Sequence, residues 1–92
     1  MNNLEVGDFI ITNYSNFPSL IVSKNFNDVE YNLLITIHEY NGDYKLINTN
    51  EMIEIINLSV EDKLCILSRY GEWFYQEHKN IFQELIIECI NV

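Results

Sequence analysis

The sequence predicts one α+β domain, with a β-rich part over residues 1–57 and a helical part over residues 58–92. Three observations support this fold class. The first half alternates short apolar runs with turn residues, which is typical of short antiparallel strands. The last third changes to the apolar spacing of amphipathic helices. The length of 92 residues suits a single domain, and a hydrophobic fraction of 48% can supply its core.

Short strands separated by turns are expected through the first half of the chain. Val6-Gly7-Asp8 indicates a turn into a strand at residues 9–11. A second strand is expected at residues 20–22, and the polar run at residues 24–28 should end it. The last strand of this part is expected at residues 52–56.

The third and fourth strands form the clearest predicted hairpin. Residues 31–40 and 44–48 flank Asn41-Gly42, the pair preferred in a two-residue type I′ turn. That turn places Ile37 opposite Leu46. Because side chains alternate along a strand, one face should belong to the core: Tyr31, Leu33, Ile35, Ile37 and Leu46. The other face is only half polar, which would suit self-association: Leu34, Thr36, His38, Lys45 and Ile47.

The C-terminal part should hold one or two helices. Ser59 precedes Glu61 and Asp62, as expected of an N-cap followed by carboxylates in the first turn. Gly71 should end this helix. The next helix carries a broad apolar stripe: Phe74, His78, Ile81, Phe82, Leu85, Ile86 and Cys89. The β-branched side chains of residues 85–92 leave open a closing strand instead of the end of this helix.

Five short strands followed by helix favour a small SH3-like antiparallel barrel with one or two C-terminal helices. An open antiparallel sheet covered on one side by helices is the alternative. Both arrangements give the same order of elements along the chain, so the sequence leaves the choice between them open.

The opening of the chain resembles that of the PemK/MazF-like toxins, which are small barrels of SH3 type. Residues 6–11 resemble the family's Gly-Asp before an apolar strand, and residues 17–23 lie where the family has an Arg-Pro pair before a second strand. The resemblance implies an endoribonuclease that uses this Arg and a later Ser or Thr. Phe17 stands where the Arg is expected, and Thr36 matches the hydroxyl position only loosely. The resemblance therefore supports the fold more than the activity.

Charge narrows the choice of partners. Fourteen acidic against five basic residues give a net charge of −9. A field of this sign repels nucleic acid and anionic membranes and attracts basic protein surfaces. Aromatic residues alternate with acids around residues 39–44 and 70–77, as in interfaces where aromatics anchor and carboxylates meet Arg and Lys. The candidate partner-binding residues are Glu39, Tyr40, Asp43, Tyr44, Glu72, Trp73, Tyr75 and Glu77.

The sequence contains no spacing typical of a catalytic or metal-binding motif. His38, His78, Cys65 and Cys89 are its soft metal ligands, and they lack the short paired spacings of zinc sites. We expect His78 to be partly buried and both cysteines to be reduced thiols in the core. No metal, no cofactor and no enzyme activity are predicted.

The leading functional hypothesis is a small non-catalytic interaction or inhibitor module that binds a basic surface of a partner protein. The chain lacks alanine and is rich in isoleucine and asparagine, which indicates an AT-rich gene, as in a low-GC bacterium or its phages and mobile elements. Without a signal peptide or membrane span, the cytoplasm, or the host cytoplasm for a viral protein, is the expected location. The alternatives are a toxin-type endoribonuclease, or a degenerate relative of one, and a subunit that forms a homodimer through the hairpin.

Overall fold

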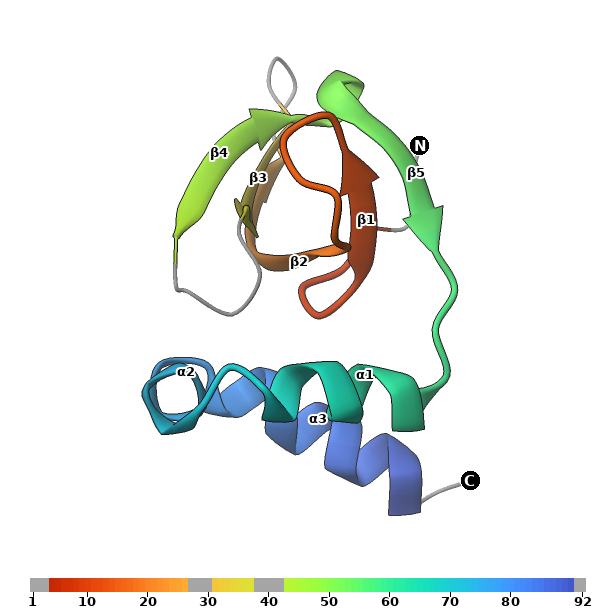
Figure 1. Cartoon of the computed structure of the whole chain (residues 1–92), viewed down its shortest axis with the longest axis vertical. Helices are drawn as coiled ribbons and strands as arrows, with labels where there is room; N and C mark the ends of the chain where they lie inside the picture. Colours follow the sequence, from red (N-terminus) through yellow and green to blue (C-terminus); the bar gives the residue numbers. More distant parts are fainter. Residues whose placement is uncertain (1–3, 27–30, 38–42, 91–92) are drawn as a thin grey trace.

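The computed structural model describes residues 4–26, 31–37 and 43–90, and it shows an antiparallel sheet followed by helices (Figure 1). The strands are β1 (Phe9–Thr12), β2 (Ser19–Phe26), β3 (Tyr31–Thr36), β4 (Tyr44–Asn48) and β5 (Met52–Ile56). The short 3-10 helix η1 (Thr49–Glu51) joins β4 to β5. The helices are α1 (Val60–Ser68), α2 (Glu72–Glu77) and α3 (Lys79–Ile90). The predicted α+β class is confirmed.

The five strands follow one another in the spatial order β4-β3-β2-β1-β5, and each neighbouring pair is antiparallel. The sheet curls so that β4 and β5 rise on opposite sides of a concave surface, while the helices lie beneath the convex side (Figure 1). In the described residues β4 and β5 are unpaired edges, so the sheet stays open and the barrel closure predicted as one alternative is not seen.

Two cores lie on the two faces of the sheet. The inner core fills the concave side: Leu4, Ile10, Ile21, Leu33, Ile35 and Ile47. The helix-facing core fills the convex side: Phe9, Leu20, Leu67, Tyr70, Phe74, Ile81, Phe82 and Leu85. Strands β1 and β2 contribute to both cores, which explains why their sequences are continuous apolar runs instead of alternating patterns.

The β3–β4 register differs from the predicted one. Leu46 lies opposite Leu34, three positions from the predicted partner Ile37. An odd shift turns β4 over, so Ile47 is buried in the inner core and Leu46 is 64% exposed. Leu33 and Ile35 are buried as predicted, but the predictions that Leu46 is a core residue and that Ile47 lies on the other face are wrong.

The physical reason is a longer connection between the two strands. The amide of Ile37 donates to the carbonyl of Asp43 at 3.2 Å, which continues the observed register beyond β3 and β4. This register buries the β-branched Ile47 beside the core strands. The free energy gained by burying this side chain favours the observed pairing of β3 with β4. The Asn41-Gly42 pair, for which a two-residue turn was predicted, lies outside the described residues.

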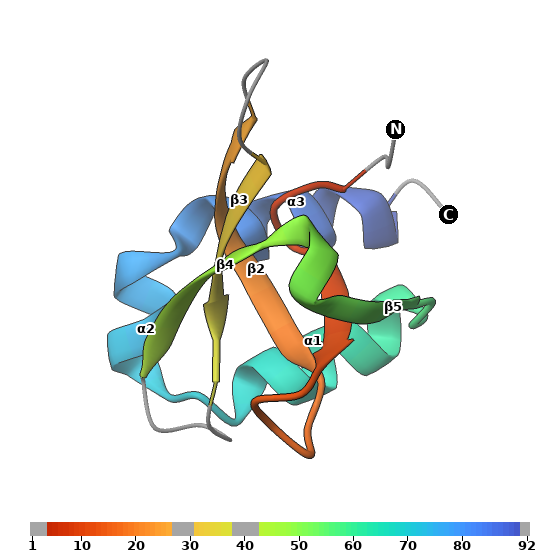
Figure 2. The same cartoon turned by 90° about the horizontal axis from the view of Figure 1, so that it is seen from above.

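Strand β2 is longer than predicted. Residues 24–26, which were expected to lie beyond the end of this strand, pair with β3, and Lys24 lies opposite Leu33. The ammonium of Lys24 donates to the carbonyl of Leu4 at 2.8 Å and forms an ion pair with Glu5 at 2.9 Å. Polar residues are tolerated in this part of the strand because the β2–β3 ribbon projects beyond the helical layer (Figure 2).

The helices begin as the sequence predicts. The hydroxyl of Ser59 accepts a hydrogen bond from the amide of Asp62 at 3.1 Å, so the predicted N-cap of α1 is confirmed. Gly71 precedes α2 with φ of 87°, a conformation that side chains other than glycine rarely adopt. The prediction that Cys65 is a core thiol is wrong, because its position on α1 faces solvent.

The second predicted helix is in fact two helices. His78 has φ of −126° and ψ of 42°, which breaks the helix between α2 and α3. The predicted stripe is buried at Phe74, Ile81, Phe82 and Leu85, whereas Ile86 is 46% exposed. Helix α3 continues to Ile90, so residues 85–90 do not form the strand that was left open. The side chain of Cys89 lies outside the described residues.

Candidate partner-binding face

Helix α2 presents most of its surface to solvent. Five of its six residues are exposed, and only Phe74 is buried. The ring of Phe74 is surrounded by other rings: its centroid lies 4.3 Å from Tyr70, 5.4 Å from Trp73, 4.5 Å from His78 and 6.1 Å from Phe82. A single buried aromatic side chain therefore fastens α2 to the helix-facing core.

The exposed side of α2 carries the four residues predicted there, two aromatic and two acidic. Trp73 is 42% exposed and meets Phe74 edge-on, while Tyr75 is 37% exposed and meets Phe82 edge-on at 5.1 Å. Each ring thus rests against the core and keeps part of its surface in solvent, as aromatic anchors of interfaces do. In the described part of the chain, neither Glu72 nor Glu77 forms an ion pair.

The start of β4 meets the junction of α2 and α3 (Figure 1). The hydroxyl oxygen of Tyr44 lies 2.6 Å from Nε2 of His78. Burial is the main cause that raises the pKa of Tyr44, and the charges of Glu77 and Tyr70 add to it. Asp43, the residue before Tyr44, is exposed. Parts of both predicted segments are therefore close in space, although they are far apart in the sequence.

The structure changes the role of some predicted residues. Tyr44 is half-buried and in contact with His78, so it packs behind the exposed residues of α2 and does not project into solvent with them. Tyr70, which lies in the second aromatic segment, is a core residue. Glu39 and Tyr40 lie outside the described residues.

His78 and Phe74 hold the exposed residues of α2 in place, and the sequence analysis predicted this role for neither of them. The only signal was the position of both residues on one apolar stripe, which also fits an ordinary core position. The prediction that His78 is partly buried is confirmed. Burial lowers the pKa of His78 below its ordinary value of 6.5, and the neighbouring charge of Glu77 opposes this effect.

The hydroxyl that the toxin resemblance would need is buried. Thr36 is 2% exposed, and its Oγ1 accepts hydrogen bonds from the amide of Leu20 at 3.0 Å and from the hydroxyl of Tyr70 at 3.4 Å. Phe17, which replaces the family's Arg, is exposed before Pro18. Thr36 therefore links β2, β3 and the helical layer. This geometry indicates a structural role for its hydroxyl.

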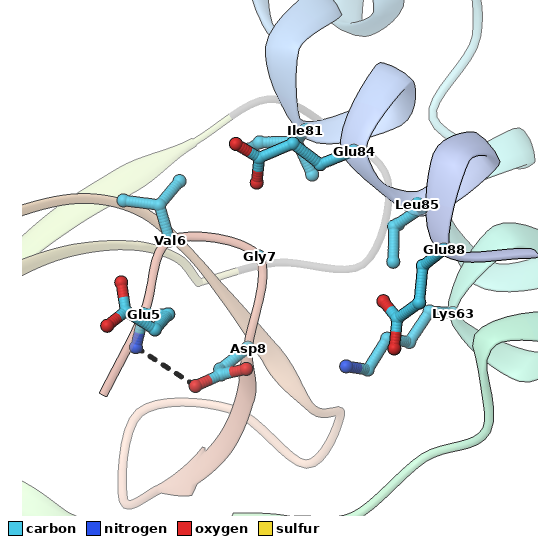
Figure 3. A pocket seen from close by; sticks show the side chains of 9 residues that line it. All are labelled: Glu5, Val6, Gly7, Asp8, Lys63, Ile81, Glu84, Leu85 and Glu88. Carbon is cyan, nitrogen blue, oxygen red and sulfur yellow. Dashed lines mark hydrogen bonds between the residues drawn. The ribbon is translucent and has the colours of Figure 1, made fainter. Parts of the chain in front are cut away.

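A pocket of about 180 Å³ lies between the first turn of the chain and the helices α1 and α3 (Figure 3). Its rim carries four carboxylates and one ammonium: Glu5, Asp8, Glu84, Glu88 and Lys63. The volume is below the roughly 300–1,000 Å³ of typical small-molecule sites. Among the residues that the structure describes, no group of three or more His, Cys, Asp or Glu side chains could hold a metal ion.

In the described ranges, no helix combines the length and the apolar character that crossing a bilayer requires. No protein-family model matches the sequence, and no curated protein or solved structure matches it significantly. A functional assignment therefore rests on the geometry and charge of the chain itself.

Proposed function

We propose that this chain is a small non-catalytic interaction module that binds a basic surface of a partner protein. The binding site is the α2 face, which consists of Glu72, Trp73, Tyr75 and Glu77, with Asp43 beside it. The observation that carries the proposal is the exposure of α2: five of six residues face solvent, and they combine aromatic rings with carboxylates.

The charge distribution supports a basic partner. The net charge is −9, and some of the few cations are engaged within the chain. Lys24 is paired with Glu5, and the ammonium of Lys45 lies 4.6 Å from the centre of the Tyr14 ring. The carboxylates of Glu72 and Glu77 give the α2 face a negative field that steers a cationic surface toward it.

The proposed biological effect is inhibition or modulation of the partner by covering that surface. A protein whose basic surface normally holds nucleic acid is the type of partner that an acidic face can occupy in competition. Direct contact of the chain with nucleic acid is not part of the proposal, because the same field repels phosphates. A phage or mobile-element origin and a cytoplasmic site of action fit this proposal.

The proposal is tested on a partner captured with the wild-type chain, by measuring association and dissociation at several salt concentrations. Glu72→Gln with Glu77→Gln should slow association more than it speeds dissociation, because rim charges act mainly on the on-rate. Trp73→Ala should speed dissociation and cost about 2 kcal/mol or more if it is a hot spot. Glu84→Gln with Glu88→Gln on α3 is the matched control, since it removes the same charge elsewhere.

Circular dichroism must show that each variant stays folded, because Trp73 also touches Phe74. A complex that is insensitive to salt and to both α2 variants contradicts the proposal. Equal slowing by the α3 control would show that only net charge matters, and the α2 face would then not be the site.

A second candidate is self-association through the hairpin. Leu46 and Leu34 are opposite each other on the outward face of β3 and β4, and Leu46 is 64% exposed. A homodimer would cover this pair. Sedimentation of wild type and Leu46→Gln over a range of concentrations tests it: a mass equal to that of the monomer for both proteins removes this candidate.

A further inference from the structure

The two edge strands of the open sheet differ in how they are protected. An unpaired edge is a template for a further strand, and proteins usually block it with a bulge or a charge. Strand β5 has both, because Ile53 is an extra residue in the register with β1 and Glu54 at the centre of the strand is exposed. Strand β4 has neither: its pairs with β3 follow one another without a shift, and its five residues include no acid. It forms the outer margin of the sheet (Figure 1).

The hydrogen bonds of the β3–β4 ladder show which backbone groups of β4 point outward. The amide of Ile37 donates to the carbonyl of Asp43, the residue directly opposite when the β3–β4 register is continued. Hydrogen-bonded and non-hydrogen-bonded pairs alternate along an antiparallel ladder. The residues of β4 that direct their N–H and C=O groups away from β3 are therefore Tyr44, Leu46 and Asn48. The amide of Asn48 agrees with this direction, since it donates to the carboxylate of Glu51 at 2.7 Å.

Leu46 is the middle residue of this outward edge. Among the described residues, nothing outside the β3–β4 ladder bonds to the amide or the carbonyl of Leu46, or to the amide of Tyr44. The side chain of Leu46 is 64% exposed. A further strand beside β4 would satisfy these backbone groups and cover the leucine at the same time.

Charge selects a second copy of β4 as that strand. In an antiparallel pair centred on Leu46, this residue faces its own copy and Lys45 faces Ile47, so no like charges are opposite each other. A pair centred on Lys45 would place two ammonium groups opposite each other, and a pair of β5 strands centred on Glu54 would do the same with two carboxylates, which is destabilising. An extended basic segment suits β4 less, because the single charge on the strand is positive.

We propose that β4 pairs with β4 of a second copy of the chain, antiparallel and about a two-fold axis at Leu46, so that the two sheets become one. The pairing deepens the second candidate function, self-association through the hairpin, and it is independent of the α2 face. A strand of five residues is only about 17 Å long. Such an interface is smaller than a standard one, so the dimer is weak.

The first test is sedimentation equilibrium of the free, full-length protein. The average mass should rise from that of the monomer toward that of the dimer between about 10 µM and about 1 mM protein, as expected of a weak complex. Each chain carries a net charge of −9, so the two copies repel each other and added salt should strengthen the dimer. Salt should have the opposite effect on a basic partner bound to the α2 face, which keeps the two interfaces distinguishable.

Three variants locate the interface. Leu46→Pro removes the outward N–H and no bond to β3, and edge strands accept proline where the N–H faces solvent. By symmetry it removes two bonds between the copies, so the dissociation constant should rise at least about tenfold. Leu46→Gln keeps the amide and should weaken the dimer less. Ile53→Gln is the matched control, because it replaces a 57% exposed apolar residue on the other edge and should leave the mass unchanged.

Amide hydrogen exchange of the wild-type protein gives a second readout that does not depend on the folding of Leu46→Pro. The amide of Leu46 should gain at least about threefold protection at high protein concentration, as expected when an exposed N–H becomes bonded. The amide of Ile47 points toward Leu33 within the ladder and should not change.

Three outcomes would overturn the proposed pairing. They are a monomer mass throughout the concentration range, a dimer that forms equally well in a folded Leu46→Pro variant, and exchange at Leu46 that does not depend on concentration. None of these measurements involves α2, so the pairing can fail while the proposed function stands, and the reverse also holds.

Discussion

Replacing Phe74 with alanine tests whether one side chain fastens α2 to the domain. Phe74 is fully buried and lies within 4.3 to 6.1 Å, centroid to centroid, of four other rings. Truncation of a buried Phe typically costs about 3–5 kcal/mol. A domain of 92 residues has a free energy of unfolding of about 5–14 kcal/mol at the usual ~0.05–0.15 kcal/mol per residue. Phe74→Ala should thus remove about a fifth of the stability or more.

The assay is urea unfolding followed by Trp73 fluorescence and by far-ultraviolet circular dichroism. Trp73 touches the Phe74 ring edge-on, so its emission reports directly on this site. Phe74→Leu keeps most of the volume and should cost less than Phe74→Ala, about 1.5 kcal/mol or less if the core repacks well. Gln76→Ala, on the exposed side of α2, is the control and should change stability by about 0.5 kcal/mol or less. A loss below about 1 kcal/mol in Phe74→Ala would refute the argument, since cavity formation at a fully buried ring costs more than that.

Four other changes have defined outcomes. Ser59→Ala should lower the free energy of unfolding by about 1 kcal/mol in urea titrations, because the amide of Asp62 loses its cap. Gly71→Ala should lower it by about 1 kcal/mol or more, since φ of 87° strains any side chain, and an unchanged denaturation midpoint would contradict that backbone assignment. The pKa of His78 is lower in the folded than in the unfolded chain, so the unfolded state binds the proton first as the pH falls. The free energy of unfolding should therefore be highest above about pH 6.5 and should decrease below it. His78→Gln should flatten this part of the pH profile. Incubation with single-stranded RNA should give no cleavage products on a gel, and cleavage that Thr36→Ala abolishes while circular dichroism stays unchanged would favour the toxin alternative.

The local signals in the sequence were sufficient for most of the fold. The strand at residues 52–56 and the Ser59 cap are where the sequence places them, because a cap depends on residues that are neighbours in the chain. The β3–β4 register was not predictable in this way. The Asn41-Gly42 pair favours a two-residue turn locally, but burial of Ile47 beside Leu33 depends on strands that only meet in the folded domain.

The candidate site was predictable in composition and not in geometry. Glu72 and Trp73 are exposed on α2 as the charge and aromatic pattern predicted. The pattern did not show that Tyr44 would be half-buried beneath them, because its contact with His78 joins residues that are 34 positions apart. The break of the helix at His78 was also missed, since the apolar stripe continues through this residue and only the backbone dihedral angles show that the helix ends there.

The pairing of β1 with β5 also determines the order in which the domain can fold during synthesis. Phe9 lies opposite Ile56, and β1 contacts β5 along its whole length. The first strand to leave the ribosome can therefore pair with β2 early, but it waits for the last strand, β5, to cover its other edge. The β2–β3 and β3–β4 pairs join strands that are nearby in the chain and can form earlier, whereas the helices α1 to α3 follow β5 and leave the ribosome after it. Because long-range pairing slows folding, we expect the docking of β5 onto β1 to limit the folding rate.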